Sequence, residues 1–218
     1  VMVDSLRALD PPLPVLSEES ESIPYAERSG WDRFWVVDPL DGTKEFIKES
    51  GEFTVNIALV EEGIPVLGVV YVPAQQIMYY AEQDAGAFRQ NDREDPIRIQ
   101  TRSADPSNLV VVASRDHAGP EVDAFIDRLP NATLKSMGSS LKFCLVAEGG
   151  ADCYIRDVPT MEWDTAAAQC VVEAAGGTVT DWDGERLTYN KEDLTNPYLM
   201  TIGDRYFSWM DHLPAVRS

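Results

Sequence analysis

Two aspartates three positions apart follow a run of apolar, strand-forming residues in the first part of the chain. Residues 34–47 read FWVVDPLDGTKEFI, so Asp38 and Asp41 stand where the predicted strand should end. Pro39 disfavours regular continuation of a strand ladder, and Gly42 lets the backbone come close to other groups. The pattern therefore predicts a tight turn that directs both carboxylates at one place.

Two ionised carboxylates in a partly buried turn repel each other and lose hydration, so a cation is expected between them. Only oxygen ligands are at hand, with no histidine or cysteine nearby in the sequence, and this favours magnesium. The alternative is an Asx-type turn in which Asp38 and Asp41 bind backbone groups. That alternative would be favoured for an isolated D-x-x-D-G, but acidic companions elsewhere favour a metal site.

Two further stretches could supply those companions. Glu18 and Glu19 follow a short apolar run in LSEES, where a plain surface location is the alternative. Asp164 begins the apolar stretch WDTAAAQCVVEAAGG, where an acid interacts favourably with the helix macrodipole. An ordinary N-terminal cap is the alternative for Asp164, although a capping carboxylate keeps lone pairs for a metal.

The composition limits the partners of the protein. The 218 residues carry a formal net charge of −19, which argues against binding a nucleic-acid polymer. An acidic protein can gather divalent cations that then hold an anionic ligand. No stretch has the length of a membrane-spanning helix, and the first residues do not resemble a signal peptide.

Three cysteines, Cys144, Cys153 and Cys170, lie in apolar contexts without C-x-x-C spacing. They are expected to be buried reduced thiols, which suits a cytoplasmic location. With two histidines in the whole chain, a histidine-rich zinc site is not expected.

The periodicity of apolar residues predicts a layered α/β domain with one shared core. A polar loop is expected at 20–32 and a hairpin turn at 61–63. Two sub-lobes are expected, at about 1–105 and 106–218. Predicted helices cover 1–9, 120–129, 139–150 and 163–177, the last two ending at glycine pairs. Predicted strands cover 14–20, 33–38, 53–73, 76–82, 86–92, 96–101, 108–115, 152–156 and 178–182.

The acidic motifs EE, DPLDGTKEF and WDTAAAQCVVEAAGG, in this order, resemble those of the inositol monophosphatase superfamily of magnesium-dependent, lithium-sensitive phosphatases. Within it, VLSEES, GEFTVNIALV, GVVYVP and GSSLKFCLVAEG resemble the bacterial CysQ-type 3'(2'),5'-bisphosphate nucleotidases. The resemblance spans nearly the whole chain. It implies an αβαβα sandwich of the inositol monophosphatase and fructose-1,6-bisphosphatase type.

The resemblance also implies two or three Mg²⁺ ions and the residues that hold them. Glu18 and Thr43 would position the attacking water, with Asp41 beside them in the catalytic set. The implied metal ligands are Glu18, Asp38, Leu40 through its backbone carbonyl, Asp41 and Asp164.

By the same resemblance the substrate is adenosine 3',5'-bisphosphate, cleaved to AMP and phosphate in sulfur assimilation or nucleotide recycling, and use of the sulfated nucleotide is left open. Ser139, Lys142 and Arg156 would hold the nucleotide end, and His117 the adenosine. Their structural alternatives are a helix cap, a solvent-facing lysine, an ion pair with Asp152 or Asp157, and a structural histidine. The full set of implied substrate contacts is Glu18, Leu40, Asp41, Gly42, Thr43, His117, Ser139, Lys142, Arg156 and Asp164.

The chain departs from the pattern of its relatives at one end. They carry a further N-terminal helix and a hairpin that supplies an acid to the threonine equivalent to Thr43, and the sequence here lacks both.

Three functions are the alternatives to a nucleotidase: an inositol monophosphatase, a nucleotide- or magnesium-binding protein without turnover, and a protein in which the acids only cap turns and helices. The expected location is the cytoplasm, with peripheral association at the inner membrane and the oligomeric state left open.

Overall fold

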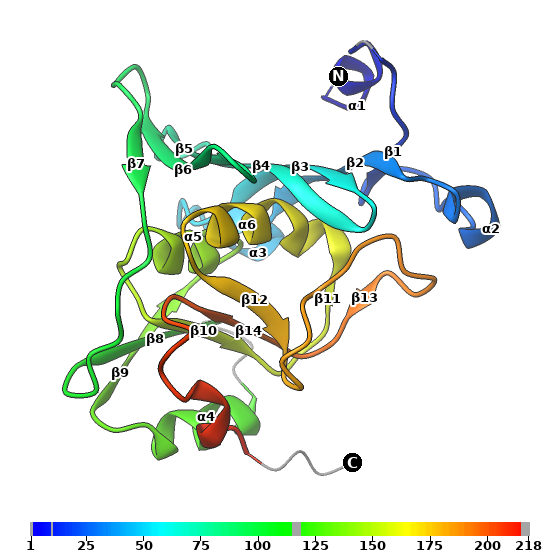
Figure 1. The fold of residues 1–218 in the computed structure, drawn as a ribbon. Helices are drawn as coiled ribbons and strands as arrows, with labels where there is room; N and C mark the ends of the chain where they lie inside the picture. The colour runs from blue at the N-terminus through cyan, green and yellow to red at the C-terminus, as the bar shows by residue number, and fades with distance from the viewer. Residues whose placement is uncertain (1, 10, 115–118, 215–218) are drawn as a thin grey trace.

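The computed structural model describes residues 2–9, 11–114 and 119–214. Two β-sheets lie roughly face to face with helices between them, and a further helix covers the far side of the second sheet (Figure 1). The N-terminal helix lies at one edge of the first sheet. The fold is therefore a mixed α/β arrangement of layers, as the sequence predicted.

The first sheet has seven strands, which follow one another in space in the order of the sequence. β1 runs parallel to β2, and all other neighbours are antiparallel. At the predicted hairpin turn, Glu62 and Gly63 both have positive φ, which matches the twist of the strands they join. The strands are β1 Val15–Ser17, β2 Arg33–Asp41, β3 Thr54–Glu61, β4 Ile64–Val72, β5 Ile77–Glu82, β6 Gly86–Asn91 and β7 Ile97–Ile99.

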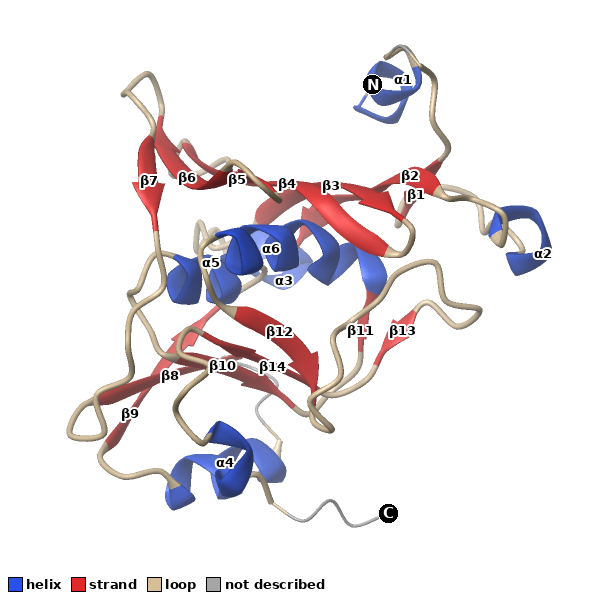
Figure 2. Ribbon diagram, viewed as in Figure 1, coloured by secondary structure: helices blue, strands red, loops and turns tan. Residues whose placement is uncertain are grey.

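The second sheet has five strands in the order β12-β14-β10-β8-β9, and a separate two-stranded pair joins β11 to β13. The pair lies beside the start of the long helix α6 (Figure 2). The strands are β8 Leu109–Ser114, β9 Ala132–Met137, β10 Cys153–Arg156, β11 Thr160–Met161, β12 Thr178–Asp181, β13 Thr195–Asn196 and β14 Leu199–Ile202.

Helices α5 and α6 fill the space between the sheets, and α6 packs directly on the strands of the first sheet. Both helices end in a Schellman motif, because the amide of the second glycine in each pair donates to the carbonyl of residue 145 or 172. Gly149 and Gly176 adopt the positive φ that this ending requires. The helices are α1 Met2–Arg7, α2 Tyr25–Arg28, α3 Thr43–Ile47, α4 Pro120–Arg128, α5 Leu141–Ala147, α6 Glu162–Ala174 and the 3₁₀ turn Trp209–His212.

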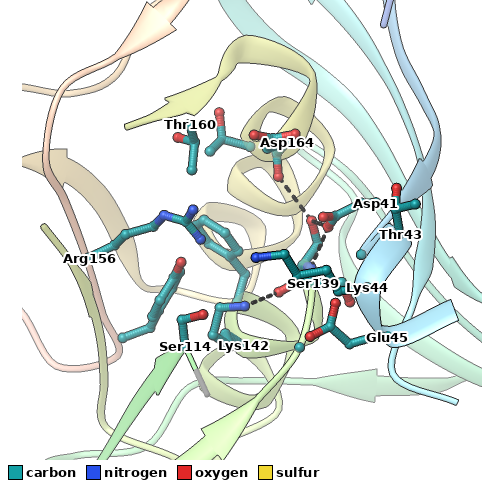
Figure 3. Close-up of a pocket in the computed structure, with 16 residues that line it drawn as sticks. Asp41, Thr43, Lys44, Glu45, Ser114, Ser139, Lys142, Arg156, Thr160 and Asp164 are labelled. Atoms are coloured by element: carbon teal, nitrogen blue, oxygen red, sulfur yellow. Dashed lines mark hydrogen bonds between the residues drawn. The ribbon is translucent and has the colours of Figure 1, made fainter. Parts of the chain in front are cut away.

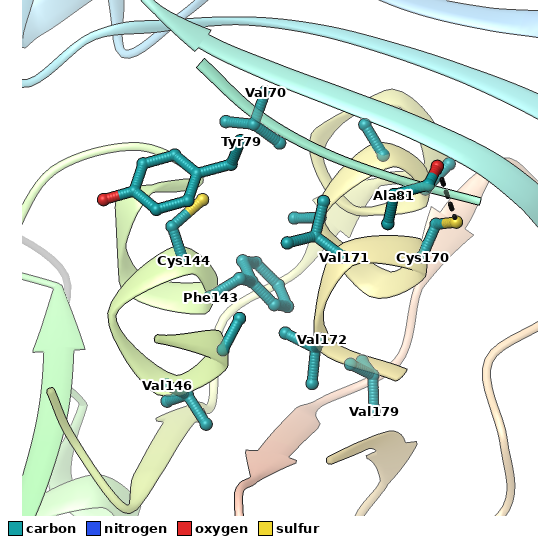
Figure 4. Packing of buried hydrophobic residues seen from close by; sticks show 14 of the residues in the cluster. Val70, Tyr79, Ala81, Phe143, Cys144, Val146, Cys170, Val171, Val172 and Val179 are labelled. Carbon is teal, nitrogen blue, oxygen red and sulfur yellow. Dashed lines mark hydrogen bonds between the residues drawn. The ribbon is translucent and has the colours of Figure 1, made fainter. Parts of the chain in front are cut away.

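The main core lies between the first sheet and the two central helices. Phe143 of α5 and Val171 and Val172 of α6 meet Val70 and Tyr79 of the sheet there (Figure 4). A second core lies between the second sheet and α4. β8 serves both cores, because alternate residues of a strand point to opposite faces: Val110 and Val112 face the central helices, and Leu109, Val111 and Ala113 face α4.

Most expected elements are confirmed, with shifts of a few residues at their ends. The polar loop at 20–32 is wrong in part, because α2 forms within it. Strands β9, β11, β13 and β14, helix α3 and the 3₁₀ turn lie where no element was predicted. β9 has mostly exposed side chains and β14 is only four residues long, so neither carries a strong hydrophobic pattern.

The predicted boundary at residue 105 falls between β7 and β8, which belong to different sheets. Because α6 comes from the second half yet packs on the first sheet, two sub-lobes remain a prediction. The three cysteines are buried free thiols, as expected. Within the described residues, no helix is long and apolar enough to cross a membrane.

The contact between α6 and the first sheet depends on Gly68 of β4. A Cβ atom at this position would lie 2.2 Å from the carbonyl oxygen of Ala167 and 2.9 Å from Cβ of Cys170. We expect Gly68→Ala to lower the free energy of unfolding by about 1–3 kcal/mol or more, because the helix must move off the sheet. Urea denaturation measures this. Gly30→Ala is the control, since a Cβ atom there meets nothing within 4 Å; equal stability of the two variants would contradict the prediction.

Candidate metal site and adjoining cavity

A β-bulge brings Asp38 and Asp41 to the same face of the first sheet. Asp38 pairs with Asn56 and Asp41 pairs with Thr54, so the two pairs are three residues apart on β2 but only two residues apart on β3. In a regular strand, residues three apart point to opposite faces, and the extra residue of a bulge reverses this. The prediction that the strand ends at Asp38 is thus wrong. The strand continues to Asp41, and its irregularity places both carboxylates on the helix side.

Asp164 meets these two aspartates from the opposite layer. One carboxylate oxygen each of Asp38, Asp41 and Asp164 can be chosen such that all lie within 4.8 Å of one another. Asp164 lies in the first turn of α6, and its Oδ2 accepts a hydrogen bond of 2.8 Å from the amide of Met161. The ordinary N-cap given as the alternative is wrong, because the N-cap residue of α6 is Met161 and Asp164 is the third residue of the helix. Its bond to the Met161 amide is that of a capping box, and it leaves the other carboxylate oxygen available.

The other predicted residues of this region lie around the cluster. Glu18 is exposed at the end of β1, outside the group of three, yet close enough to act on the charge of Asp38 and Asp164. Leu40 lies in the bulge, where its amide donates to Oδ1 of Asp38 at 2.9 Å. Gly42 has φ +92° and precedes Thr43, which begins α3 and is exposed at the cavity. Their ligand and catalytic roles remain predictions.

Burial and the crowding of the carboxylates raise the pKa values of two of them. Burial, followed by the charge of Asp41, raises the pKa of Asp38 to about 9. The same two causes, in the same order, raise the pKa of Asp164 to about 7. Without a cation, the cluster therefore retains protons that free aspartates would release.

The cluster has the properties of a binding site for a hard cation. Asp38 is 1% exposed, and its Oδ2 is a buried atom without a hydrogen-bond partner. A buried carboxylate oxygen without a partner is costly unless a cation or a proton occupies it. All the candidate ligand atoms are oxygens, which suits a magnesium- or calcium-type ion.

Asp41 is held by side chains that the sequence analysis did not select. Its Oδ2 accepts hydrogen bonds from Thr54 Oγ1 at 3.2 Å and from Asn56 Nδ2 at 3.4 Å. It also accepts from the backbone amide and the hydroxyl of Ser140, at 2.6 and 2.8 Å. A sequence signal for two of them exists, because Thr54 and Asn56 are polar residues at alternate positions of an apolar strand.

A cavity of about 200 Å³ opens beside the cluster. Asp41 and Asp164 lie on one side of it, and Lys142 and Arg156 lie on the other (Figure 3). Lys44, Glu45, Ser114, Tyr154 and Thr160 also line this cavity, and the sequence analysis gave none of them a role. We call the side with Asp41 and Asp164 the acidic side of the cavity and the side with Lys142 and Arg156 its basic side.

Lys142 is buried, so the solvent-facing alternative is wrong. It is 3% exposed, and its ammonium donates to the carbonyl of Ser139 at 2.6 Å and lies 5.3 Å from the Tyr154 ring centroid. Burial lowers the pKa of Lys142 to about 8, with Asp41 raising it and Arg156 lowering it to smaller extents. A buried cation beside a second cation favours the binding of an anion in the cavity.

Arg156 and Ser139 also face this space. Nε of Arg156 donates to the carbonyl of Val158 at 3.1 Å. Asp152, one of its suggested partners, is paired instead with Arg102 at 2.6 Å. Ser139 does not cap α5, whose N-cap residue is Ser140; its φ is +47° and its buried hydroxyl has no partner. His117 lies outside the described residues, so its role remains a prediction.

Comparison with known proteins agrees with this fold. Residues 1–201 match the inositol monophosphatase family. The 3'(2'),5'-bisphosphate nucleotidase CysQ of Escherichia coli strain K12 is 49% identical over 198 residues, which cover 90% of this chain and 78% of the relative. CysQ of Haemophilus influenzae strain Rd is 39% identical over 212 residues, covering 95% and 78%. The crystal structure of CysQ from Bacteroides thetaiotaomicron superposes with a TM-score of 0.81 at 46% identity, covering 90% and 79%.

The fold and the acidic cluster define a class of layered α/β proteins with a site for a metal ion between a sheet and a helix. The chain belongs to the inositol monophosphatase family. The predicted resemblance to this superfamily and, within it, to the CysQ-type proteins is confirmed.

The raised pKa of Asp38 predicts how the stability of the metal-free protein depends on pH. The folded protein keeps the proton up to about pH 9, whereas the unfolded chain releases it near the ordinary value of 3.8. The free energy of unfolding should therefore fall as the pH rises through this window. Asp38→Asn should flatten this dependence and stabilise the metal-free protein at the alkaline end.

Urea denaturation in the presence of a chelator, at several pH values between these limits, provides the measurement. Asp127→Asn is the matched control, because it removes the same charge from an exposed position in α4. An Asp38→Asn variant with the same pH dependence as the wild type and the control would contradict the prediction.

Proposed function

We propose that the protein is a phosphatase that hydrolyses the 3'-phosphate of adenosine 3',5'-bisphosphate and releases AMP and phosphate. The names of its relatives support a nucleotide bearing two phosphates. The observation that carries the proposal is the two-sided cavity, in which an acidic cluster for metal faces the buried Lys142 and the partly buried Arg156. A substrate with two phosphate groups fits this arrangement, because one can approach the metal side and the other the basic side.

The proposed cofactor is Mg²⁺, in two or three copies. Asp38, Asp41 and Asp164 would hold it, with Glu18 and the carbonyl of Leu40 completing the ligands. When bound, the metal would neutralise the acidic side, lower the pKa of a water and stabilise the charge of the departing oxygen. The unpartnered Oδ2 of Asp38 supports this assignment.

The protein groups at the metal side would orient the reacting molecules. The hydroxyl of Thr43 and the carboxylate of Glu18 would hold the attacking water and fix its direction toward phosphorus. Gly42 would let the chain approach the phosphate closely, since a side chain there would meet Glu45 and Ser139 at 3.3 Å. Asp41 would be fixed in place by the hydrogen bonds to its Oδ2.

The groups at the basic side would hold the part of the substrate that is not cleaved. Lys142 and Arg156 would bind the second phosphate, and the unpartnered hydroxyl of Ser139 would contact the sugar. An inositol monophosphate has no second phosphate for these cations, which makes it the weaker candidate. A protein that binds nucleotide without turnover is the other outcome that activity measurements would detect.

Further parts of the proposal concern the surroundings of the protein. Three buried free thiols support a reducing cytoplasm. The net charge of −19 supports a small-molecule substrate and disfavours a nucleic-acid polymer. Peripheral association with a membrane remains a prediction from the family resemblance.

Removal of one carboxylate charge should abolish turnover without loss of the fold. Asp164→Asn keeps an oxygen for the amide of Met161 but removes a metal ligand, so we expect phosphate release from adenosine 3',5'-bisphosphate to fall at least 100-fold, on the order expected for lost electrostatic stabilisation. Phosphate release at saturating Mg²⁺ is the measurement. Asp105→Asn, an exposed aspartate that also accepts from a backbone amide, should keep full activity.

Wild-type turnover by Asp164→Asn would refute the phosphatase assignment. Turnover of inositol phosphate in preference to the nucleotide by the wild-type protein would support the alternative substrate.

Replacement of the buried Lys142 should distinguish the contribution of the second phosphate from that of the phosphate that is cleaved. We expect Lys142→Met to reduce kcat/KM for adenosine 3',5'-bisphosphate by roughly tenfold or more, because a charge-assisted hydrogen bond contributes about 1.5–3 kcal/mol. Hydrolysis of a small phosphomonoester such as 4-nitrophenyl phosphate should change much less. Lys135→Met, on the exposed strand β9, serves as the control. Equal losses on both substrates would exclude Lys142 from contact with the second phosphate.

A further inference from the structure

We infer that Thr54, Asn56 and Ser140 are positioning residues that fix one oxygen of Asp41 and leave the other for the metal. This inference rests on the metal site of the proposed function. Thr54 and Asn56 lie on β3, and Ser140 is the N-cap residue of α5. Their side chains had no role in the sequence analysis.

The number of donors on one atom carries the inference. Oδ2 of Asp41 lies within hydrogen-bond distance of four donor atoms, at 2.6, 2.8, 3.2 and 3.4 Å. A carboxylate oxygen has about two lone-pair sites, so these donors occupy Oδ2 fully. Coordination of a cation therefore falls to Oδ1. The carboxylate plane can no longer rotate without breaking several hydrogen bonds.

Burial makes this arrangement rigid. Thr54 is 0% exposed, and Asn56 and Ser140 are each 1% exposed. Water therefore cannot replace a donor that is lost, and an unpaired oxygen in this place would be costly. Rigid support of a metal ligand by surrounding hydrogen bonds raises metal affinity.

Ser140 also connects the two halves of the metal cluster. Its hydroxyl accepts from Nδ2 of Asn56 at 3.0 Å and lies 2.8 Å from Oδ2 of Asp41 and 2.9 Å from the backbone carbonyl oxygen of Asp164. The single hydroxyl proton of Ser140 can be donated either to Oδ2 of Asp41 or to the carbonyl oxygen of Asp164. The Ser140 amide donates to Asp41 whichever of the two accepts that proton. Ser140 thereby sets the separation between the ligand on β2 and the ligand on α6.

The test uses a pair of substitutions at one position. Thr54→Val keeps the shape of the side chain but removes the donor, whereas Thr54→Ser keeps the donor. We expect Thr54→Val to weaken Mg²⁺ binding by about 10–100-fold and Thr54→Ser to retain most of the affinity. Ser140→Ala should weaken binding by at least as much, because it removes the hydroxyl proton shared by Asp41 and the Asp164 carbonyl and also the acceptor of Asn56.

Isothermal titration calorimetry with Mg²⁺ alone, on the full chain, measures the affinity without any assay of activity. Thr201→Val is the matched control, since Thr201 is also 0% exposed but its hydroxyl has no partner. It should bind Mg²⁺ as the wild type does. Phosphate release should then show a raised Mg²⁺ requirement for Thr54→Val that excess Mg²⁺ partly overcomes.

Three results would decide the inference. The inference is supported if Thr54→Val binds Mg²⁺ more weakly than the wild type while Thr54→Ser and Thr201→Val keep most of the wild-type affinity. Unchanged Mg²⁺ affinity in both Thr54→Val and Ser140→Ala overturns it while the metal site stands. A wild-type protein that binds no Mg²⁺ overturns the metal site itself, and this inference with it.

Discussion

Three carboxylates in one buried place are the constraint on which the rest of this structure depends. One carboxylate oxygen from each of Asp38, Asp41 and Asp164 lies within 4.8 Å of the other two, and burial and the charge of Asp41 raise the pKa values of Asp38 and Asp164. Without a cation, Asp38 and Asp164 keep their protons to a higher pH than free aspartates do, because they are buried beside Asp41. The layers that surround the cluster can therefore be understood as a rigid frame that holds an unfavourable charge arrangement until a metal ion offsets it.

The frame works because its ligands come from separate layers. Asp41 lies on a bulged strand of the first sheet, and Asp164 lies on a helix whose opposite end is closed by a Schellman motif. Ser140 connects the two through contacts that span 99 positions of the sequence to Asp41 and 24 to Asp164. On the far side of the same cavity, Lys142 is buried on α5. A protein of net charge −19 thereby offers a local basic surface to an anion.

Much of the fold could be predicted because the relevant signals are local. The apolar runs of β2, β3, β4 and β8, the glycine pairs after α5 and α6, and the hairpin at Glu62 and Gly63 each depend on residues close in sequence. The short strands β9 and β14 could not be predicted in this way. β9 is largely exposed, and β14 is held by antiparallel pairing with β10 and β12. Their hydrogen bonds depend on partners that no local pattern reveals.

The sequence by itself determined which chemical groups are available: the carboxylates of Glu18, Asp38, Asp41 and Asp164, in this order, with no histidine or cysteine among them. Only the tertiary structure decided how these groups are used. The bulge in β2 turned Asp41 to the face of Asp38, and contacts from β3 and Ser140 occupied one of its two oxygens. The physical reason is that residue type fixes the charge and hydrogen-bonding capacity of a side chain, whereas distance, burial and free lone pairs arise from neighbours far away in the sequence.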